Sequence, residues 1–173
     1  MALFNQLQSS ILENELLHPF QKSIGPFNGC TEHNFVVRAI IDKYTKQVKS
    51  QVHFLFLDIA DAFGTISVET ILYLLDKMGA SAGTTDMIRE IYRNCSTTLT
   101  CGNERTPQIP IRVGVRQGCP LSMLLFNIGI NPILMAIEQC PAAGVSIANR
   151  QVKCLAYADD IVLTALTIDW LQR

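Results

Sequence analysis

A short, almost continuous apolar run lies between Gln51 and Ile59. A strand with one wet face alternates apolar and polar residues, so an unbroken run predicts a strand buried on both faces. The chain therefore has to build a sheet with apolar cover on each side. The run closes on Asp58, which places a carboxylate at the end of this strand. Its apolar residues are Val52, Phe54, Leu55, Phe56 and Leu57.

The period of the apolar residues divides the rest of the chain into helices and strands. Helices are expected over residues 1–20 with an end at Pro19, over Thr31–Lys46, Ser67–Met78, Thr84–Asn94 and 120–139, and from Thr167 onward. Strands are expected over Thr97–Cys101, Gln108–Val113, Gln151–Tyr157 and Ile161–Ala165, with turns at 102–105 and 158–160 and a loop over Ser23–Gly29. Thr31 and Ser67 are the expected N-caps, and Gly79 the expected helix end.

Residues 119–137 contain no charged side chain, and their length is close to that of a membrane span. The segment nevertheless contains Asn127, Asn131 and Pro132, which are costly in lipid. We therefore interpret it as a helix buried in protein, and Pro120 suits its first turn.

The composition, 49% hydrophobic and 17% charged, predicts a folded core and surface made to lie against absent neighbours. The formal net charge of −1 does not suit a nucleic-acid binder, because affinity for phosphate comes mainly from Lys and Arg. Either nucleic acid is not the partner, or the basic surfaces lie outside this chain.

The six cysteines form no C-x-x-C pair and follow no signal peptide, so we expect reduced intracellular thiols. The spacing from Cys30 to His33 is half of a zinc site, but no second half follows it.

Three carboxylates, Asp58, Asp159 and Asp160, fall at the ends of apolar strands. Neighbouring carboxylates repel each other, so such a group indicates a compensating cation, and Mg²⁺ prefers oxygen ligands. Two such ions about 4 Å apart support phosphoryl transfer. Each aspartate alone is also compatible with an ordinary turn, because turns favour Asp for local hydrogen bonding.

Three segments, in order, resemble the palm motifs of reverse transcriptases. They are Phe56-Leu57-Asp58-Ile59-Ala60-Asp61-Ala62-Phe63-Gly64, Arg116-Gln117-Gly118-Cys119-Pro120-Leu121-Ser122 and Tyr157-Ala158-Asp159-Asp160. The second segment, followed by Leu124-Leu125-Phe126-Asn127, resembles non-LTR, LINE-type retrotransposons. Ala62-Phe63-Gly64 and the upstream Gly29-Cys30-Thr31-Glu32-His33-Asn34 resemble the lineage that inserts into ribosomal RNA genes. Met123, where many relatives have proline, and Gly64, where many have an acidic residue, depart from the common pattern.

The resemblance implies a role for each matching residue. Asp58, Asp159 and Asp160 would be catalytic and would hold two Mg²⁺ ions, with Mn²⁺ as a substitute and the Ile59 backbone as a further ligand. The nucleotide-binding residues would be Ile59, Ala60, Asp61, Phe63, Gln117 and Gly118. In this set Phe63 would lie under the sugar and exclude a 2′-hydroxyl. Arg116, Tyr157 and Ala158 would contact primer or template, although Arg116 could equally pair with an acidic neighbour.

The implied fold is an α+β polymerase palm whose small antiparallel sheet is backed by the helices at 67–78, 84–94 and 120–139. Residues 1–50 would be partial fingers and 51–173 palm, with a fingers-derived insert at about 80–113 and the thumb absent. The implied activity is RNA-directed DNA synthesis, in which the primer 3′-hydroxyl attacks the α-phosphate of a deoxynucleotide. The partners would be an RNA template, a DNA primer, deoxynucleotides and the missing fingers and thumb, with no membrane, at a nuclear site.

Other interpretations stay open. The chain could be a non-catalytic remnant of such an element, truncated at both ends, and we expect the isolated chain to polymerise poorly or not at all. A group II intron maturase or a telomerase is a further alternative, which the 29–33 and 62–64 segments disfavour.

Overall fold

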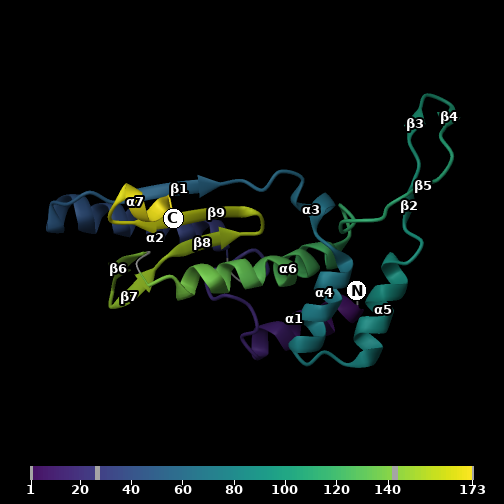
Figure 1. The fold of residues 1–173 in the computed structure, drawn as a ribbon, viewed down its shortest axis with the longest axis horizontal. Coiled ribbons are helices and arrows are strands. Elements are labelled where there is room, and N and C mark those ends of the chain that lie inside the picture. The colour runs from purple at the N-terminus through teal and green to yellow at the C-terminus, as the bar shows by residue number, and fades with distance from the viewer. Residues whose placement is uncertain (1, 26–27, 142–143, 173) are drawn as a thin grey trace. The chain divides into compact units, whose positions relative to one another are not determined.

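The computed structural model describes residues 2–25, 28–141 and 144–172. Some residues of the predicted elements lie outside the described residues. They are Met1 of the first predicted helix, Pro26 and Phe27 of the predicted loop, and Arg173 of the predicted palm. The chain forms two compact units. The first comprises Met1–Gln6 and Asp61–Gly129, and the second comprises Leu7–Ala60 and Ile130–Arg173. Figure 1 shows the helices and strands of both.

The second unit is built on a three-stranded antiparallel sheet with the strand order β1-β9-β8. The strands are β1 (His53–Leu57), β8 (Cys154–Tyr157) and β9 (Asp160–Ala165). A further antiparallel pair joins β6 (Val145–Ile147) to β7 (Arg150–Val152), so the predicted strand over Gln151–Tyr157 is divided at Lys153. The short helix α7 (Ile168–Leu171) follows β9, as expected from Thr167. Helices combined with small antiparallel sheets confirm the predicted α+β class.

The core of this unit forms between its strands and the helix α2 (Gly29–Asp42), which continues into the π-helix η1 (Lys43–Val48). The buried cluster consists of Ile40, Tyr44, Val145, Val152 and Leu155. The helices predicted to back the sheet did not include α2. Two of the helices expected to back the sheet, at 67–78 and 84–94, belong to the first unit.

The strand β1 is shorter and more exposed than its apolar run predicted. It spans 5 residues, and Phe56 near its end is 71% exposed. The prediction of burial on both faces was wrong for this part of the strand. The strand β1 lies at the edge of the sheet and, of the described strands, pairs only with β9. Its apolar sequence therefore did not ensure that other residues bury its side chains.

The ends of α1 (Ala2–Glu13) and α2 also differ from the prediction. The first helix stops well before Pro19, because Glu15 adopts φ 50° and the Leu16 N–H donates to the Ile11 carbonyl at 3.1 Å. This is a Schellman-type end without glycine. At the start of α2 the N-cap is Asn28, whose side chain accepts from the Thr31 N–H, so Thr31 is not the cap.

The first unit contains α3 (Ala62–Thr65), α4 (Val68–Lys77) and α5 (Ala82–Tyr92). The predicted limits of α4 are confirmed. The Ser67 hydroxyl accepts from the Thr70 N–H at 3.3 Å, and Gly79 follows the helix at φ 83°. The helix α4 lies against α5, and its buried residues are Ile71, Leu72 and Leu75.

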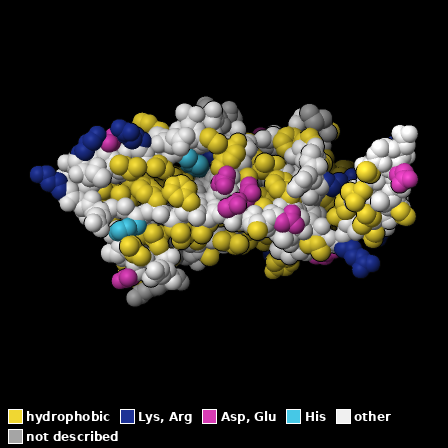
Figure 2. Space-filling view, turned by 90° about the horizontal axis from the view of Figure 1, so that it is seen from above, with side chains coloured by type: hydrophobic (Ala, Val, Ile, Leu, Met, Phe, Trp, Pro, Cys, Tyr) yellow, Lys and Arg dark blue, Asp and Glu magenta, His cyan; other side chains and the backbone are white. Residues whose placement is uncertain are grey.

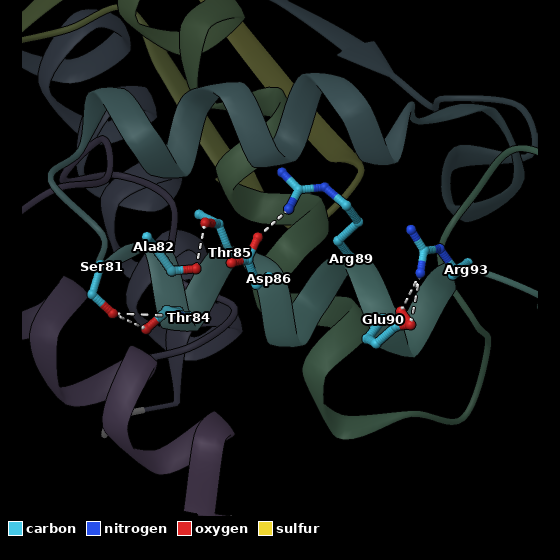
Figure 3. Close-up of polar contacts among 8 residues, drawn as sticks. All are labelled: Ser81, Ala82, Thr84, Thr85, Asp86, Arg89, Glu90 and Arg93. Carbon is cyan, nitrogen blue, oxygen red and sulfur yellow. Dashed lines mark hydrogen bonds and ion pairs between the residues drawn. The ribbon is translucent and has the colours of Figure 1, made fainter.

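The helix α5 begins at Ala82, slightly earlier than the predicted Thr84. The reason is the cap, because the Ser81 hydroxyl accepts from the Thr84 N–H at 3.2 Å (Figure 3). Ion pairs between residues one turn apart then run along its exposed face, namely Arg89–Asp86 and Arg93–Glu90 (Figure 3). Such exposed pairs add little stability.

The hairpin after α5 is divided into two short ladders. One joins β2 (Ser96–Thr97) to β5 (Ile109–Pro110), and the other joins β3 (Thr100–Cys101) to β4 (Glu104–Arg105). The predicted turn over 102–105 was therefore too long, since residues 104–105 are paired. Every residue from 96 to 110 is exposed, so no buried face holds a continuous register.

The helix α6 (Pro120–Gln139) opens at Pro120, as predicted. By length and composition alone it could cross a membrane, but 56% of its most apolar window is buried within the protein. A core helix of a soluble protein has the same properties. In the second unit, the Asn131 side chain accepts from the His18 N–H at 2.7 Å and donates to the Leu16 carbonyl at 3.3 Å, which supports burial in protein.

Candidate active site

Asp58 and Asp160 lie at the same end of the β1–β9 ladder. The last registered pair is Leu57 with Ile161. Asp58 follows Leu57 and Asp160 precedes Ile161, so continuation of the register sets the two aspartates opposite each other. Both line one pocket of about 320 Å³. The apolar remainder of its lining comes from Phe56, Leu57, Ile161 and Val162.

The turn between β8 and β9 places Asp159 beside this pair. Tyr157 pairs with Asp160, so only Ala158 and Asp159 form the loop. The predicted turn was wrong in including Asp160, which opens β9. Ala158 has φ 55°, a left-handed conformation that alanine disfavours. Asp159 is half-buried, and Asp160 and Asp58 are exposed.

The three carboxylates have no basic partner among the salt bridges of the described residues. Acidic side chains gather beside hydrophobic surface on one face in Figure 2. Unpaired carboxylate oxygens are ligands suited to Mg²⁺, so the donor set fits a divalent cation. Within 2–25, 28–141 and 144–172, no three His, Cys, Asp or Glu side chains are already grouped as metal ligands. The aspartate side chains would therefore have to converge around a metal.

Other predicted contacts of the second unit lie close to these acids in the chain. Ile59 and Ala60 follow Asp58 outside the strands, and Ile59 is half-buried while Ala60 is exposed. Tyr157 ends β8 with its side chain exposed, and Ala158 is buried. Their contacts with nucleotide or primer stay predictions.

The first unit holds Phe63 in a defined position. Its ring stacks on that of Phe126, with the centroids 5.2 Å apart and the planes 17° apart. The Val115 N–H donates to the Phe63 carbonyl at 2.7 Å. A Cβ on Gly64 would meet the Asp61 carboxylate, so glycine leaves room for the Asp61 side chain in its present position.

The remaining predicted residues of this unit lie in the loop before α6. Arg116 donates from Nε to the Cys95 sulfur at 2.9 Å and from the guanidinium Nη2 to the Ile91 carbonyl at 3.3 Å. None of the salt bridges between described residues joins Arg116 to an acidic side chain. Gln117 and Gly118 are exposed, and Gly118 has φ 83°, a conformation that favours glycine.

Gln21 was missed by the sequence analysis. Its side chain hydrogen-bonds to the backbone of Ala158 in the β8–β9 turn. A lone glutamine in a loop carries no periodic or spacing signal, so the contact only becomes visible in the folded chain.

A family model described as "Reverse transcriptase (RNA-dependent DNA polymerase)" matches residues 2–173. The chain belongs to the reverse transcriptase family. That assignment confirms the predicted family and, by family, the predicted enzyme class.

Similar reverse transcriptase sequences come from R2 retrotransposable elements. The Pol polyprotein of the type-1 element R2 of Popillia japonica is 32% identical over 148 residues, covering 85% of this chain and 21% of that protein. The corresponding R2 protein of Nasonia vitripennis is 30% identical over 96% of this chain and 16% of its own length. The R2DM protein of Drosophila melanogaster is 29% identical over 89% of this chain and 14% of its own length. The predicted non-LTR lineage is thereby confirmed, and the chain spans about a fifth or less of these relatives.

The reverse transcriptase chain also resembles a solved telomerase structure, apo telomerase from Candida tropicalis truncated from its C-terminal domain. The TM-score is 0.63 over 99% of this chain and 34% of that one, at 10% identity. At this identity the likeness shows the fold, and it confirms the predicted polymerase palm class.

Proposed function

We propose that this chain is the catalytic palm segment of an RNA-directed DNA polymerase from an R2-type element, adding deoxynucleotides to a primer 3′-hydroxyl. The observation that carries the proposal is that Asp58 and Asp160 line one pocket at the end of the β1–β9 ladder, with Asp159 in the adjoining turn. A module that only bound nucleic acid would not need three unpaired carboxylates there, because without a cation they repel phosphate.

Asp58, Asp159 and Asp160 would hold two divalent metal ions, with the Ile59 backbone as a further ligand. Bound metal would stabilise the negative charge that develops on the phosphoryl oxygens during transfer. The chain's own part is to fix the carboxylates on paired strands, where the register and the tight turn limit their movement.

Phe63 would select deoxynucleotides by its bulk. Its stacked ring and its bonded carbonyl hold it in place, so a 2′-hydroxyl would meet a rigid obstacle. Gln117 and Gly118 would shape the nucleotide and template pocket, and Arg116, Tyr157 and Ala158 would lie against primer or template. The backbone at Ile59 and Ala60 would approach the incoming triphosphate, and Asp61 would contribute near the metal site.

The RNA template and DNA primer would be gripped mainly by protein outside this segment. Its net charge of −1 offers little attraction for a phosphate backbone. We therefore propose that fingers and thumb segments complete the polymerase, and that these 173 residues alone extend primers poorly or not at all. The division into partial fingers over 1–50 and palm over 51–173 belongs to the same proposal.

The test is primer extension on an RNA template by the full-length protein, with Asp58→Asn and Asp159→Asn variants. Each substitution keeps the side-chain size, removes a metal-binding charge and should lower incorporation by about 10³-fold or more. Asp169→Asn, an exposed aspartate of α7, is the matched control and should extend normally. Unchanged incorporation by either variant contradicts the proposed mechanism. No extension by the unsubstituted protein would indicate a non-catalytic remnant instead.

A further inference from the structure

Gln21 makes two hydrogen bonds to one residue of the β8–β9 turn. Its Oε1 accepts from the Ala158 N–H at 2.8 Å, and its Nε2 donates to the Ala158 carbonyl at 3.1 Å. Gln21 is 7% exposed and Ala158 is 3% exposed, so water has little access to either bond. One side chain therefore satisfies both backbone polar groups of Ala158.

The side chain continues a pairing that the backbone begins. Gln21 forms an isolated parallel bridge with Ala156 of β8. The Ala156 N–H donates to the Phe20 carbonyl at 3.0 Å, and the Lys22 N–H donates to the Ala156 carbonyl at 3.0 Å. Beyond Ala156, the Gln21 amide takes the place of the next peptide group. The 20–22 segment thus pairs with the free edge of β8 at Ala156, and the Gln21 side chain reaches from there to the turn.

The orientation of the Gln21 amide is fixed by its donors. Besides Ala158, Oε1 accepts from the Ser23 N–H at 3.3 Å and from the Ser23 hydroxyl at 2.9 Å. Two backbone N–H groups point at this atom, and an N–H can only donate, so the atom is the oxygen. The amide nitrogen must then face the Ala158 carbonyl.

Ala158 needs such support because of its conformation. At φ 55° it lies in the left-handed region, where the alanine Cβ is crowded by the following carbonyl. The two-residue loop favours a positive φ at its first residue, but alanine is penalised there, so loss of the Gln21 bonds would let the turn relax toward a negative φ. That change rotates the peptide between Ala158 and Asp159, and it would shift the carboxylates of Asp159 and Asp160.

We propose that Gln21 is a positioning residue, whose amide holds Ala158 in the left-handed conformation and thereby aims Asp159 and Asp160. The inference rests on the proposed function, because it gives the two aspartates a catalytic task. Gln21 acts only through Ala158. An alanine at position 21 can make neither hydrogen bond to Ala158. A glutamate carboxylate can accept from the Ala158 N–H but cannot donate to the Ala158 carbonyl, so both bonds require an amide.

The first test is steady-state primer extension by the full-length protein, corrected for the active fraction. Gln21→Ala should lower kcat by about 10- to 100-fold, as loss of an orienting partner does. The KM for deoxynucleotide should change by less than about threefold, since the aspartates and not the nucleotide contacts move. The kcat of the Gln21→Glu variant should lie between that of Gln21→Ala and that of the unsubstituted protein. Gln8→Ala, which removes a half-buried glutamine bonded to the Ile24 carbonyl at 2.9 Å, is the matched control and should keep its kcat.

The second test, amide hydrogen exchange, does not depend on activity. Gln21→Ala should speed exchange of the Ala158 N–H by about tenfold or more, because this N–H loses its acceptor. The Ala156 N–H, which donates to a backbone carbonyl, should be nearly unchanged. Unaltered exchange at Ala158 would overturn the proposal.

A second substitution that restores kcat would distinguish a positioning role of Gln21 from a general loss of folded structure. In the Gln21→Ala protein, Ala158→Gly should recover kcat by about fivefold to tenfold, because glycine adopts positive φ without the alanine penalty. An unchanged kcat in Gln21→Ala, or an equal loss in Gln8→Ala, would overturn the proposal. If the unsubstituted protein extends no primer, the proposed function fails, and hydrogen exchange still decides whether Gln21 holds the turn.

Discussion

The ring of Phe63 lies against the ring of Phe126, nearly parallel to it at a centroid distance of 5.2 Å. Phe126 is buried in α6, so it forms a firm backing for Phe63, which is only half-buried in α3. A residue that excludes a 2′-hydroxyl by bulk works only if it cannot move aside. The stacking therefore connects a core residue to the choice between deoxy- and ribonucleotides.

Replacing Phe126 with leucine should weaken this choice. The smaller, non-planar side chain no longer supports the Phe63 ring, and the preference for deoxynucleotides should fall by about 3- to 10-fold. Phe63→Ala should reduce it further, by about 100-fold. The measurement is the ratio of kcat/KM for a deoxynucleotide to that for its ribonucleotide, which is insensitive to the active fraction. A constant ratio in both variants would contradict the role of Phe63.

Gly114 should be more sensitive to substitution than Gly102, although both have positive φ. It has φ 95°, and an added Cβ would lie 2.7 Å from the Phe63 carbonyl oxygen. Gly114→Ala should therefore cost about 2–4 kcal/mol of unfolding free energy, through both backbone strain and the collision. Gly102→Ala is the control for strain alone, since Gly102 has φ 60° and open space around it, and it should cost about 1–2 kcal/mol. Equal losses in denaturant titrations would contradict this difference.

His18 should make stability depend on pH. Its side chain is 1% exposed, and burial lowers its pKa below 6.5, although the charge of Glu138 at 3.6 Å opposes the shift. The unfolded state then binds more protons between the two pKa values, so this contribution is complete above about pH 6.5 and is lost as the pH falls. The slope cannot exceed about 1.4 kcal/mol per pH unit.

The substitution His18→Asn tests this dependence. Asparagine can still accept from the Phe20 N–H, as His18 Nδ1 does at 3.3 Å, but it cannot become charged. Its unfolding free energy should fall less steeply below about pH 6.5 than that of the unsubstituted protein. Parallel slopes in urea titrations at several pH values would show that His18 does not titrate in this way.

Five of the six cysteines should react in two groups, with the half-buried Cys119 between them. Burial raises the pKa of Cys154 to about 12, so almost none of it is thiolate at neutral pH. Cys95 is also buried, whereas Cys30, Cys101 and Cys140 are exposed. Brief alkylation of the native protein should label the exposed three and spare Cys154, as peptide mass spectrometry would show. Early labelling of Cys154 would mean that β8 opens readily.

Capping residues and proline predicted the ends of helices, because these ends depend on residues close by in the sequence. Ser67 and Gly79 fix the limits of α4, and Pro120 fixes the start of α6, because caps and proline act within one turn. The β8–β9 hairpin followed from two apolar arms around an acidic turn. The motif resemblance identified the family and singled out the aspartates, which composition alone could not do.

Features that depend on distant contacts were not predictable in the same way. The exposure of Phe56 depends on what covers the edge strand β1, and the broken ladder over 96–110 depends on the lack of a buried face. The hydrogen bonds from Gln21 to Ala158 join segments far apart in the chain, and the period of apolar residues relates only residues that are close in sequence.

That Asp58, Asp159 and Asp160 together bind divalent metal is tested most directly by Mn²⁺ titration, with free Mn²⁺ counted by electron paramagnetic resonance. The unsubstituted full-length protein should bind more Mn²⁺ than the Asp58→Asn and Asp159→Asn variants, while the Asp169→Asn control should bind as much as the unsubstituted protein. The expected loss arises because each asparagine removes a charged oxygen ligand. Equal Mn²⁺ binding by all four proteins would contradict a metal site at this end of the sheet.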